Sequence, residues 1–202
     1  MKRIIKQVTI LGSGIMGSRI ACHFANIGVQ VLLLDIVPRE PNDAEKAAGL
    51  GLDNKKVRNR IVNDALQAAI KSNPAPLYHQ SFASRIQTGN FEDDMHRIAQ
   101  SDWVMEVVVE NLKIKQQVFE QVEKYRTPGT LITSNTSGIP IHMMAAGRSD
   151  DFRQHFCGTH FFNPPRYLKL LEIIPTPETQ KEVTDFLMQY GSKFLGKTTV
   201  LA

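Results

Sequence analysis

Short apolar runs alternate with segments of helical periodicity at the start of the chain. Residues 8–11 form an apolar run that ends at a glycine. Between residues 15 and 27, apolar side chains recur every three or four positions, which predicts a helix that Gly28 terminates. A second apolar run at residues 31–34 ends at Asp35. Strand, helix and strand in this order predict a βαβ unit with parallel strands.

The same alternation continues to the end of the chain. Further strands are expected at residues 84–89, 103–109, 131–133, 156–162, 170–174 and 198–201. Further helices are expected at residues 57–70, 91–99, 112–125, 140–146 and 176–191. In the last helix, Thr176-Pro177-Glu178 has the pattern of a cap, a first-turn proline and an acidic first turn.

This order predicts one α/β domain over residues 1–202, with a Rossmann-type, doubly wound and mostly parallel sheet and flanking helices. The chain stops at Leu201-Ala202 on a predicted strand, without a polar tail. We therefore expect it to be part of a longer protein.

Composition narrows the class of protein. The 202 residues are 42% hydrophobic and 22% charged, which disfavours disordered, fibrous and disulfide-rich classes. No apolar run reaches the roughly 18 residues of a spanning helix, so no membrane insertion is expected. The net charge of +4 is mild and no arginine-rich block is present, so no nucleic-acid partner is expected. Cys22 and Cys157 lack metal-type spacing, which favours reduced thiols, no metal and a cytoplasmic location.

A glycine-rich motif follows the first strand: Gly12-Ser13-Gly14-Ile15-Met16-Gly17. It fits G-x-G-x-x-G and opens the first predicted helix, the context in which this motif binds dinucleotides. Gly12 permits the tight turn, Gly14 the approach of a pyrophosphate, and Gly17 close packing of helix and sheet. Asp35 can accept hydrogen bonds from a ribose 2′-hydroxyl and favours NAD, although nearby Arg39 leaves NADP open. The alternative is a glycine-rich turn that holds no ligand.

Polar side chains follow several later strands, where ligands of open α/β sheets bind. They are Glu110-Asn111 at the end of the strand at 103–109, Lys115 in the next helix, residues 134–138, residues 160–163, and Glu172 in the following strand.

His160 stands out among the six histidines because apolar residues adjoin it and a turn could bring Glu172 to it. A carboxylate partner fixes the tautomer and favours the imidazolium, as a general base requires. A purely structural His–Glu pair is an equally open interpretation. Ser137 fits a cap or turn and lacks the surroundings of a hydrolase nucleophile. The other histidines are expected at the surface or hydrogen-bonded: His23, His79, His96, His142 and His155.

Four segments together resemble the 3-hydroxyacyl-CoA dehydrogenase family. They are Ile10-Leu11-Gly12-Ser13-Gly14-Ile15-Met16-Gly17, Val109-Glu110-Asn111-Leu112, Ser134-Asn135-Thr136-Ser137 and His160-Phe161-Phe162-Asn163-Pro164. The resemblance covers nearly the whole chain. It is greatest to the NAD-binding part of long bacterial β-oxidation enzymes.

The resemblance implies a role for each site residue. His160 would be the base that takes the 3-hydroxyl proton, Glu172 would orient it, and Ser137 would bind the substrate oxygen. Asn163 would lie near nicotinamide and substrate. Further cofactor contacts would come from Glu110, Lys115, Asp35 and the loop residues Gly12, Gly14, Ile15, Met16 and Gly17. The implied substrate is an acyl-CoA and the implied cofactor is NAD.

The chain also departs from the family pattern. Family members continue into a helical domain, opened by an Asp-x-Pro-Gly-Phe-type motif, that makes most of the dimer interface and is absent here. We therefore expect the 202 residues alone to bind NADH but turn over little substrate. Lys55 and Lys56, beside Arg58 and Arg60, would meet CoA phosphates or form a solvated helix face. A dehydrogenase of a small hydroxy or sugar acid, or a non-catalytic NAD-binding domain, stays open.

Overall fold

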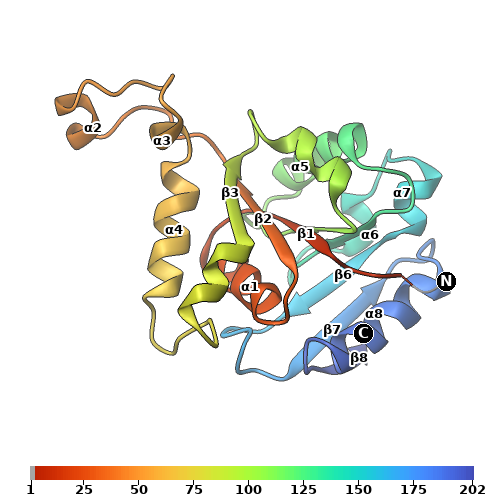
Figure 1. Ribbon diagram of the computed structural model, residues 1–202. Coiled ribbons are helices and arrows are strands. Elements are labelled where there is room, and N and C mark those ends of the chain that lie inside the picture. The colour runs from red at the N-terminus through yellow and green to blue at the C-terminus, as the bar shows by residue number, and fades with distance from the viewer. Residues whose placement is uncertain (1–2) are drawn as a thin grey trace.

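The strands lie in one sheet in the order β3-β2-β1-β4-β5-β6-β7-β8 (Figure 1). A computed structural model describes residues 3–202. The strands are β1 (Gln7–Leu11), β2 (Gln30–Asp35), β3 (Ile86–Asn90), β4 (Trp103–Glu106), β5 (Leu131–Ser134), β6 (Phe156–Phe161), β7 (Leu170–Pro175) and β8 (Thr198–Leu201).

Helices cover both faces of this sheet (Figure 1). They are α1 (Ile15–Asn26), α2 (Asp43–Ala47), α3 (Lys55–Arg58), α4 (Arg60–Ile70), α5 (Leu112–Tyr125), α6 (Ile141–Met144), α7 (Asp150–Gln154) and α8 (Lys181–Lys193), with 3₁₀ turns at Gln80–Arg85 and Met95–Gln100.

The strand directions confirm the predicted Rossmann-type topology. Neighbouring strands from β3 to β6 are parallel, β7 is antiparallel to β6, and β8 is parallel to β7. The chain winds outward from β1 in one direction to β3 and from β4 in the other direction to β6. The carboxyl ends of β1 and β4 therefore flank the switch point of the sheet, where ligands of this fold bind.

Alternate side chains of the central strands enter two apolar cores. Ile10 and Leu33 pack with α1, α4 and α8, whereas Leu11, Leu32 and Leu34 pack with α5, α6 and α7. Because successive strand residues point to opposite faces, a strand buried on both faces becomes a continuous apolar run. That is the pattern from which these strands were predicted.

Several boundaries differ from the sequence expectation. The strand expected at 103–109 ends at Glu106, because its register partners Leu11 and Ser134 are the last residues of both neighbouring strands. Glu110 therefore lies in a loop rather than at the strand end. The strand expected at 84–89 begins at Ile86, after a 3₁₀ turn. The short helix expected at 91–99 is only the 3₁₀ turn at 95–100.

Two predicted helices are also different in detail. The helix at 57–70 breaks at Asn59, whose side chain accepts a hydrogen bond from Asn90 Nδ2 at 2.7 Å. The last helix begins at Lys181 rather than at residue 176. Thr179 instead donates to the carbonyl of Phe156 and accepts the amide of Thr176, which holds this segment as a turn.

Within residues 3–202, no helix is long and apolar enough to cross a membrane. The same residues contain no group of three or more side chains suited to bind a metal ion. Cys22 and Cys157 are free thiols in the core.

Candidate functional site

The glycine-rich loop packs directly between β1, α1 and the end of β4. Gly12 has a φ of +104°, and a Cβ there would lie 2.6 Å from the carbonyl oxygen of Val107. A Cβ on Gly17 would lie 1.8 Å from the carbonyl oxygen of Gly12. Both contacts are shorter than any side chain tolerates, so these two glycines are required by the fold of the loop.

Gly14 is different because its surroundings are open. It is exposed, and no atom lies within 4 Å of a Cβ built on it. It is also the N-cap of α1, and no side chain caps that helix. The first N–H groups of α1 and the positive end of its dipole therefore face open space. This cradle fits a pyrophosphate.

Asp35 lies beside this cradle at the end of β2. One carboxylate oxygen accepts hydrogen bonds from the backbone N–H and the hydroxyl of Ser13, at 2.6 and 2.5 Å. The other accepts from the N–H of Ile36 at 2.7 Å. These bonds fix the carboxylate next to the loop, and a carboxylate in this position is chemically suited to accept hydrogen bonds from a ribose diol. Arg39 is exposed and takes part in no ion pair among residues 3–202.

His160 and Glu172 form a hydrogen-bonded pair. The antiparallel register of β6 and β7 places them directly opposite each other. His160 Nδ1 lies 2.7 Å from Glu172 Oε2, and the imidazole contacts the ring of Phe162 with 4.4 Å between centroids. Both side chains are partly exposed. With Nδ1 bound to the carboxylate, Nε2 is the nitrogen that can exchange a proton with a substrate.

A buried ion-pair network that sequence analysis missed lies next to this edge. Glu106, at the end of β4, is fully buried and accepts hydrogen bonds from Lys115 Nζ at 2.8 Å and from the Ser134 hydroxyl at 2.5 Å. Lys115 is also buried and reaches Glu110 Oε2 at 3.3 Å. Burial raises the pKa of Glu106, and Lys115 opposes this shift. A glutamate inside an apolar strand is the signal that could have revealed this network.

Glu110 connects the network to the loop after β5. Its Oε1 atom accepts hydrogen bonds from the Thr136 hydroxyl and from the N–H of Gly138, the two residues that flank Ser137. Partial burial acts to raise the pKa of Glu110, but these hydrogen bonds and Lys115 together lower it. Ser137 itself is exposed. Glu110 therefore braces the turn that carries Ser137 at this edge of the sheet.

Asn163 is hydrogen-bonded to α1, the helix that begins at the glycine loop. Arg19 of α1 donates to Asn163 Oδ1 at 2.7 Å, so the residue just after β6 is held against the helix that opens at the glycine loop. Sequence analysis missed Arg19. Its position in the second turn of the helix that the glycine motif opens was the available signal.

Comparisons with known proteins show the family to which the domain belongs. Residues 7–202 match the family model described as 3-hydroxyacyl-CoA dehydrogenase, NAD binding domain. The chain belongs to this family. NAD is accordingly the cofactor of the domain, and the cradle at Gly14 fits it.

Relatives of this NAD-binding domain are larger proteins. The chain is 50% identical over its whole length to a probable 3-hydroxyacyl-CoA dehydrogenase of Bacillus subtilis, of which it covers 26%. It is 34% identical to the human mitochondrial hydroxyacyl-coenzyme A dehydrogenase, covering 98% of the chain and 59% of that protein. The structure of 3-hydroxybutyryl-CoA dehydrogenase from Escherichia coli matches with a TM-score of 0.71 at 28% identity, over 98% of the chain and 38% of that protein.

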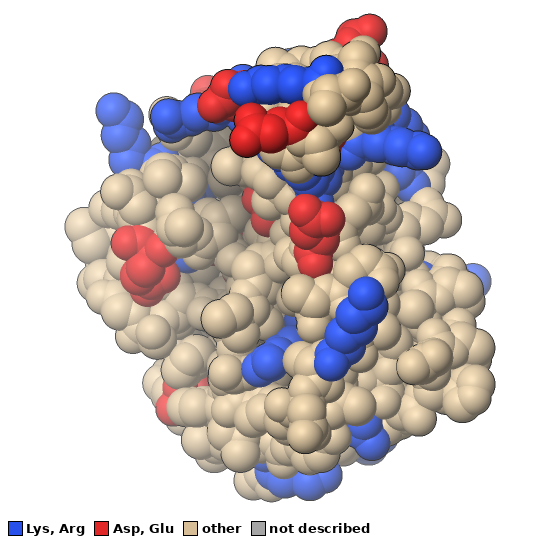
Figure 2. All heavy atoms as spheres, turned by 90° about the vertical axis from the view of Figure 1, so that its left-hand side faces the viewer, with Lys and Arg blue, Asp and Glu red and all other residues tan. Residues whose placement is uncertain are grey.

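The basic helix α3, which carries Lys55, Lys56 and Arg58, does not lie at this site. Lys55 and Lys56 are exposed on α3, which lies with α2 beyond the edge strand β3 (Figure 1). Arg58 is paired with Glu92 and Asp93. Figure 2 looks onto this side and shows basic and acidic side chains interspersed at its top. A wholly basic surface is not present on this face.

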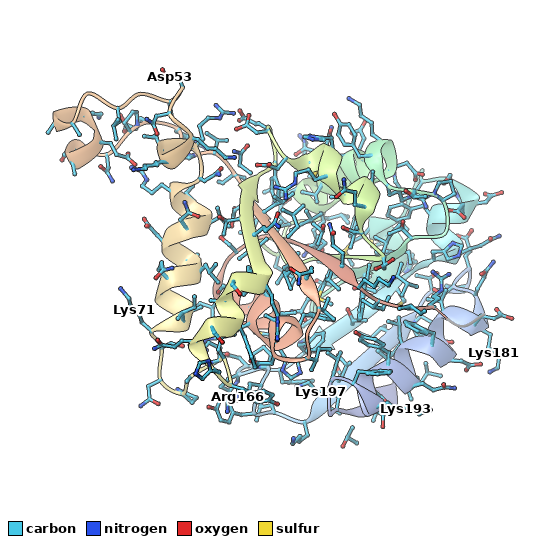
Figure 3. All side chains as sticks on the ribbon, in the orientation of Figure 1. Asp53, Lys71, Arg166, Lys181, Lys193 and Lys197 are labelled. Atoms are coloured by element: carbon cyan, nitrogen blue, oxygen red, sulfur yellow. The ribbon has the colours of Figure 1, made fainter. Side chains whose placement is uncertain are left out.

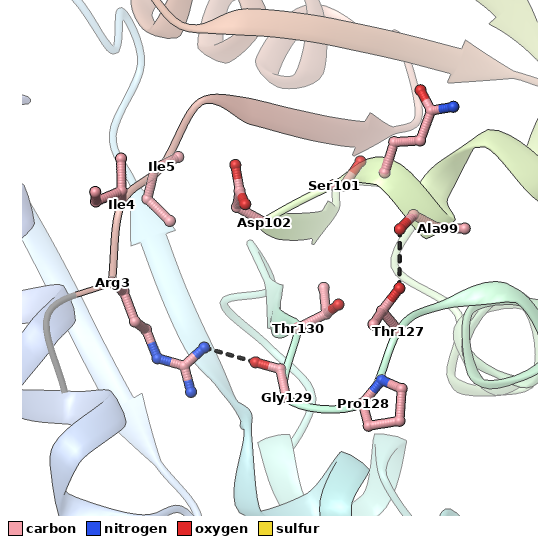
Figure 4. A pocket seen from close by; sticks show the side chains of 11 residues that line it. Arg3, Ile4, Ile5, Ala99, Ser101, Asp102, Thr127, Pro128, Gly129 and Thr130 are labelled. Carbon is pink, nitrogen blue, oxygen red and sulfur yellow. Dashed lines mark hydrogen bonds between the residues drawn. The ribbon is translucent and has the colours of Figure 1, made fainter.

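Two cavities bear on the location of the site. One of about 320 Å³ adjoins the glycine loop and is lined by Gly14, Arg19 and the small residues Ala65 and Ala69 of α4. The other, of about 330 Å³, contains Asp102 and lies at the amino ends of β1, β4 and β5 (Figure 4). That end of the sheet is opposite the glycine loop, so the second cavity is not part of the site.

His23 differs from the sequence expectation of a surface or fully hydrogen-bonded histidine. It is buried on α1, its Nε2 lies 3.0 Å from the carbonyl oxygen of Leu195, and its Nδ1 has no hydrogen-bond partner among the described residues. Burial, followed by the nearby Lys197, lowers the pKa of His23 to about 4. It is therefore a neutral core residue at physiological pH.

Proposed function

We propose that this chain is the cofactor-binding and base-carrying domain of an NAD-dependent (S)-3-hydroxyacyl-CoA dehydrogenase of fatty-acid β-oxidation. The reaction is oxidation of (S)-3-hydroxyacyl-CoA to 3-oxoacyl-CoA. The observation that carries the proposal is the His160–Glu172 pair on the strand end that shares an edge with the open cradle at Gly14. The names of the relatives support it.

Four groups of residues hold the cofactor in this proposal. The N–H groups that follow Gly14 bind the pyrophosphate, and Asp35 binds the adenosine ribose. Glu110, in the loop after β4, supports the nicotinamide ribose, and buried Lys115 of α5 holds Glu110 in place. Asn163, oriented by Arg19, lies near the nicotinamide and the substrate. When bound, NAD accepts the hydride that leaves C3 of the substrate.

The chain supplies the proton chemistry. His160 Nε2 takes the 3-hydroxyl proton, and the Glu172 carboxylate at Nδ1 stabilises the resulting imidazolium. Ser137 donates a hydrogen bond to the substrate oxygen, on a turn that Glu110 braces. A base held in this way contributes roughly 10²–10⁴-fold to the rate.

Further proposals concern the substrate and the assembly. Lys55 and Lys56 would meet the CoA phosphates only if substrate binding brings α3 toward the site. We place the protein in the cytoplasm, where the buried free thiols of Cys22 and Cys157 stay reduced. Dimerisation would occur mainly through a further helical domain, as the family resemblance implies.

The proposal is tested by the choice of substrate. The natural protein that carries this chain should reduce NAD⁺ with (S)-3-hydroxybutyryl-CoA and not with free 3-hydroxybutyrate, as followed by NADH absorbance. Residues 1–202 alone should bind NADH but turn over little of either substrate. Equal or faster reduction with the free hydroxy acid would instead show a dehydrogenase of small hydroxy acids.

A further inference from the structure

Lys197 is a buried ammonium that the site described above does not use. Only 5% of the residue is exposed. Its Nζ donates hydrogen bonds to the carbonyl oxygens of Pro165 and, at 2.7 Å, Leu168. It lies 5.7 Å from the ring centroid of Phe161. No carboxylate among residues 3–202 forms an ion pair with it, so its partners are backbone carbonyls and an aromatic face.

The carbonyls that Lys197 holds belong to the loop between the two strands of the His160–Glu172 pair. This catalytic loop, residues 162–169, begins beside His160 and ends at β7. The amides of Tyr167 and Leu168 both donate to the carbonyl oxygen of Pro164, at 3.0 Å each, which folds the loop into a turn. Lys197 contacts this turn through the carbonyl oxygens of Pro165 and Leu168.

The backbone beside Lys197 ties the same loop to the sheet. The N–H of Thr198 donates to the carbonyl oxygen of Lys169 at 2.8 Å, where β8 begins. Figure 3 labels Lys197, and Arg166 of the catalytic loop, at the lower edge of the molecule. The chain at the start of β8 therefore holds the catalytic loop in two ways. The backbone N–H of Thr198 binds one end of the loop, and the ammonium of Lys197 binds two carbonyls within it.

We propose that Lys197 is a positioning residue, whose ammonium fixes the catalytic loop so that Asn163 and the His160–Glu172 pair keep their relative placement. The inference rests on the proposed function for its catalytic consequence. Its structural part stands without it. An ammonium suits this task because it offers three donors, and the buried carbonyl of Pro165 and the partly buried carbonyl of Leu168 would otherwise lose their hydrogen bonds.

Burial of the ammonium makes the charge of Lys197 sensitive to pH, and other basic groups surround it. Lys169 and Arg166 lie on the catalytic loop, and neutral His23 faces it from α1. Burial and, to a lesser degree, Lys169 lower the pKa of Lys197 to about 8. Deprotonation leaves one donor fewer and removes the charge from both carbonyl bonds. The loop should therefore become less ordered as the pH rises through this value.

The first test is amide hydrogen exchange by NMR on residues 1–202, without cofactor. Lys197→Met keeps the length of the side chain and removes its donors. It should speed exchange of the Tyr167 and Leu168 amides by about tenfold or more at neutral pH, since charged hydrogen bonds contribute about 1.5–3 kcal/mol. The matched control is Lys193→Met, an exposed lysine at the end of α8, which should leave these amides unchanged.

The second test needs no variant. In the wild-type chain, the amide chemical shifts of Tyr167 and Leu168 should titrate with a midpoint near pH 8, and Lys197→Met should abolish this transition. Unchanged exchange in Lys197→Met, or no such transition in the wild type, overturns the proposal. If Lys197→Met does not fold, the wild-type titration decides alone.

Activity separates this inference from the proposed function. In the natural protein, Lys197→Met should lower kcat by about tenfold and change the Kd of NADH much less, because the glycine loop and Asp35, which bind the pyrophosphate and the adenosine ribose in this proposal, do not contact Lys197. If exchange and titration behave as expected but the protein does not oxidise 3-hydroxyacyl-CoA, the proposed function fails and the anchoring of the loop stands. An altered exchange rate with an unchanged kcat shows a structural anchor only and overturns the catalytic part.

Discussion

Replacing Lys115 by methionine removes the one cation that residues 3–202 supply to the buried network around Glu106. Methionine has a similar length and carries no charge, so the main change is electrostatic. Lys115 is 1% exposed and Glu106 is 0% exposed, which leaves the carboxylate in the interior without a counter-ion. Removal of one member of a buried pair costs about 3–5 kcal/mol. Because Ser134 and the N–H of Val108 still bind Glu106, we expect the free energy of unfolding to fall by about 3 kcal/mol, at the lower end of this range.

The loss of stability in Lys115→Met should increase as the pH rises. Burial already raises the pKa of Glu106 in the folded wild type, and removal of Lys115 raises it further. A carboxyl whose folded pKa lies above its unfolded value destabilises the protein as the pH rises from the unfolded pKa through the folded pKa. The difference between Lys115→Met and wild type should therefore be larger at about pH 7 than at about pH 5.

Urea denaturation at these two pH values measures both effects, with Lys113→Met as the control. Lys113 is an exposed lysine on the same helix, and its substitution should change stability by less than about 0.5 kcal/mol. The double variant Glu106→Gln with Lys115→Met should recover part of the loss, because the uncompensated charge is gone. A loss below about 1 kcal/mol, or one that is equal at both pH values, would refute this account of the network.

Three further predictions concern the cofactor cradle and the base. Asp35→Ala should weaken NADH binding by more than about tenfold in a calorimetric titration and should not weaken NADPH binding; an unchanged NADH affinity excludes the ribose contact. Gly14→Ala should keep the melting temperature and weaken NADH binding, whereas Gly17→Ala should prevent folding of the loop, because its Cβ would lie 1.8 Å from a carbonyl oxygen. Equal melting temperatures of these two variants would contradict the description of the loop. Glu172→Gln should lower kcat by about tenfold or more with little effect on NADH affinity, and an unchanged kcat would leave the pair without a catalytic role.

The sheet could be predicted because its central strands are buried on both faces. Residues 8–11 and 31–34 are continuous apolar runs for that reason, and the glycine motif marks the turn between β1 and α1. The strand at 103–109 was overestimated, since the end of a strand depends on where its neighbours end. That information is not local: Glu106 is the last residue of β4 because Leu11 and Ser134 are the last of theirs.

Side-chain partners far apart in the sequence could be predicted only in part. Glu172 was proposed for His160 because both lie on strands joined by a short turn. Glu106 and Arg19 escaped notice because their partners come from other elements, β5 and α5 for Glu106 and the loop after β6 for Arg19. Likewise, the sequence around Lys197 gives no sign that its ammonium turns toward the catalytic loop.

The central claim is that His160 is the base of a 3-hydroxyacyl-CoA dehydrogenase, and its most direct test is the effect of His160→Gln on the natural protein. The account predicts that kcat for oxidation of (S)-3-hydroxybutyryl-CoA falls by at least about 10²-fold, while the Kd of NADH stays within about twofold of wild type. A near-normal kcat would contradict the claim. A loss of NADH affinity equal to the loss of kcat would also contradict it, because His160 would then act in cofactor binding and not in proton transfer.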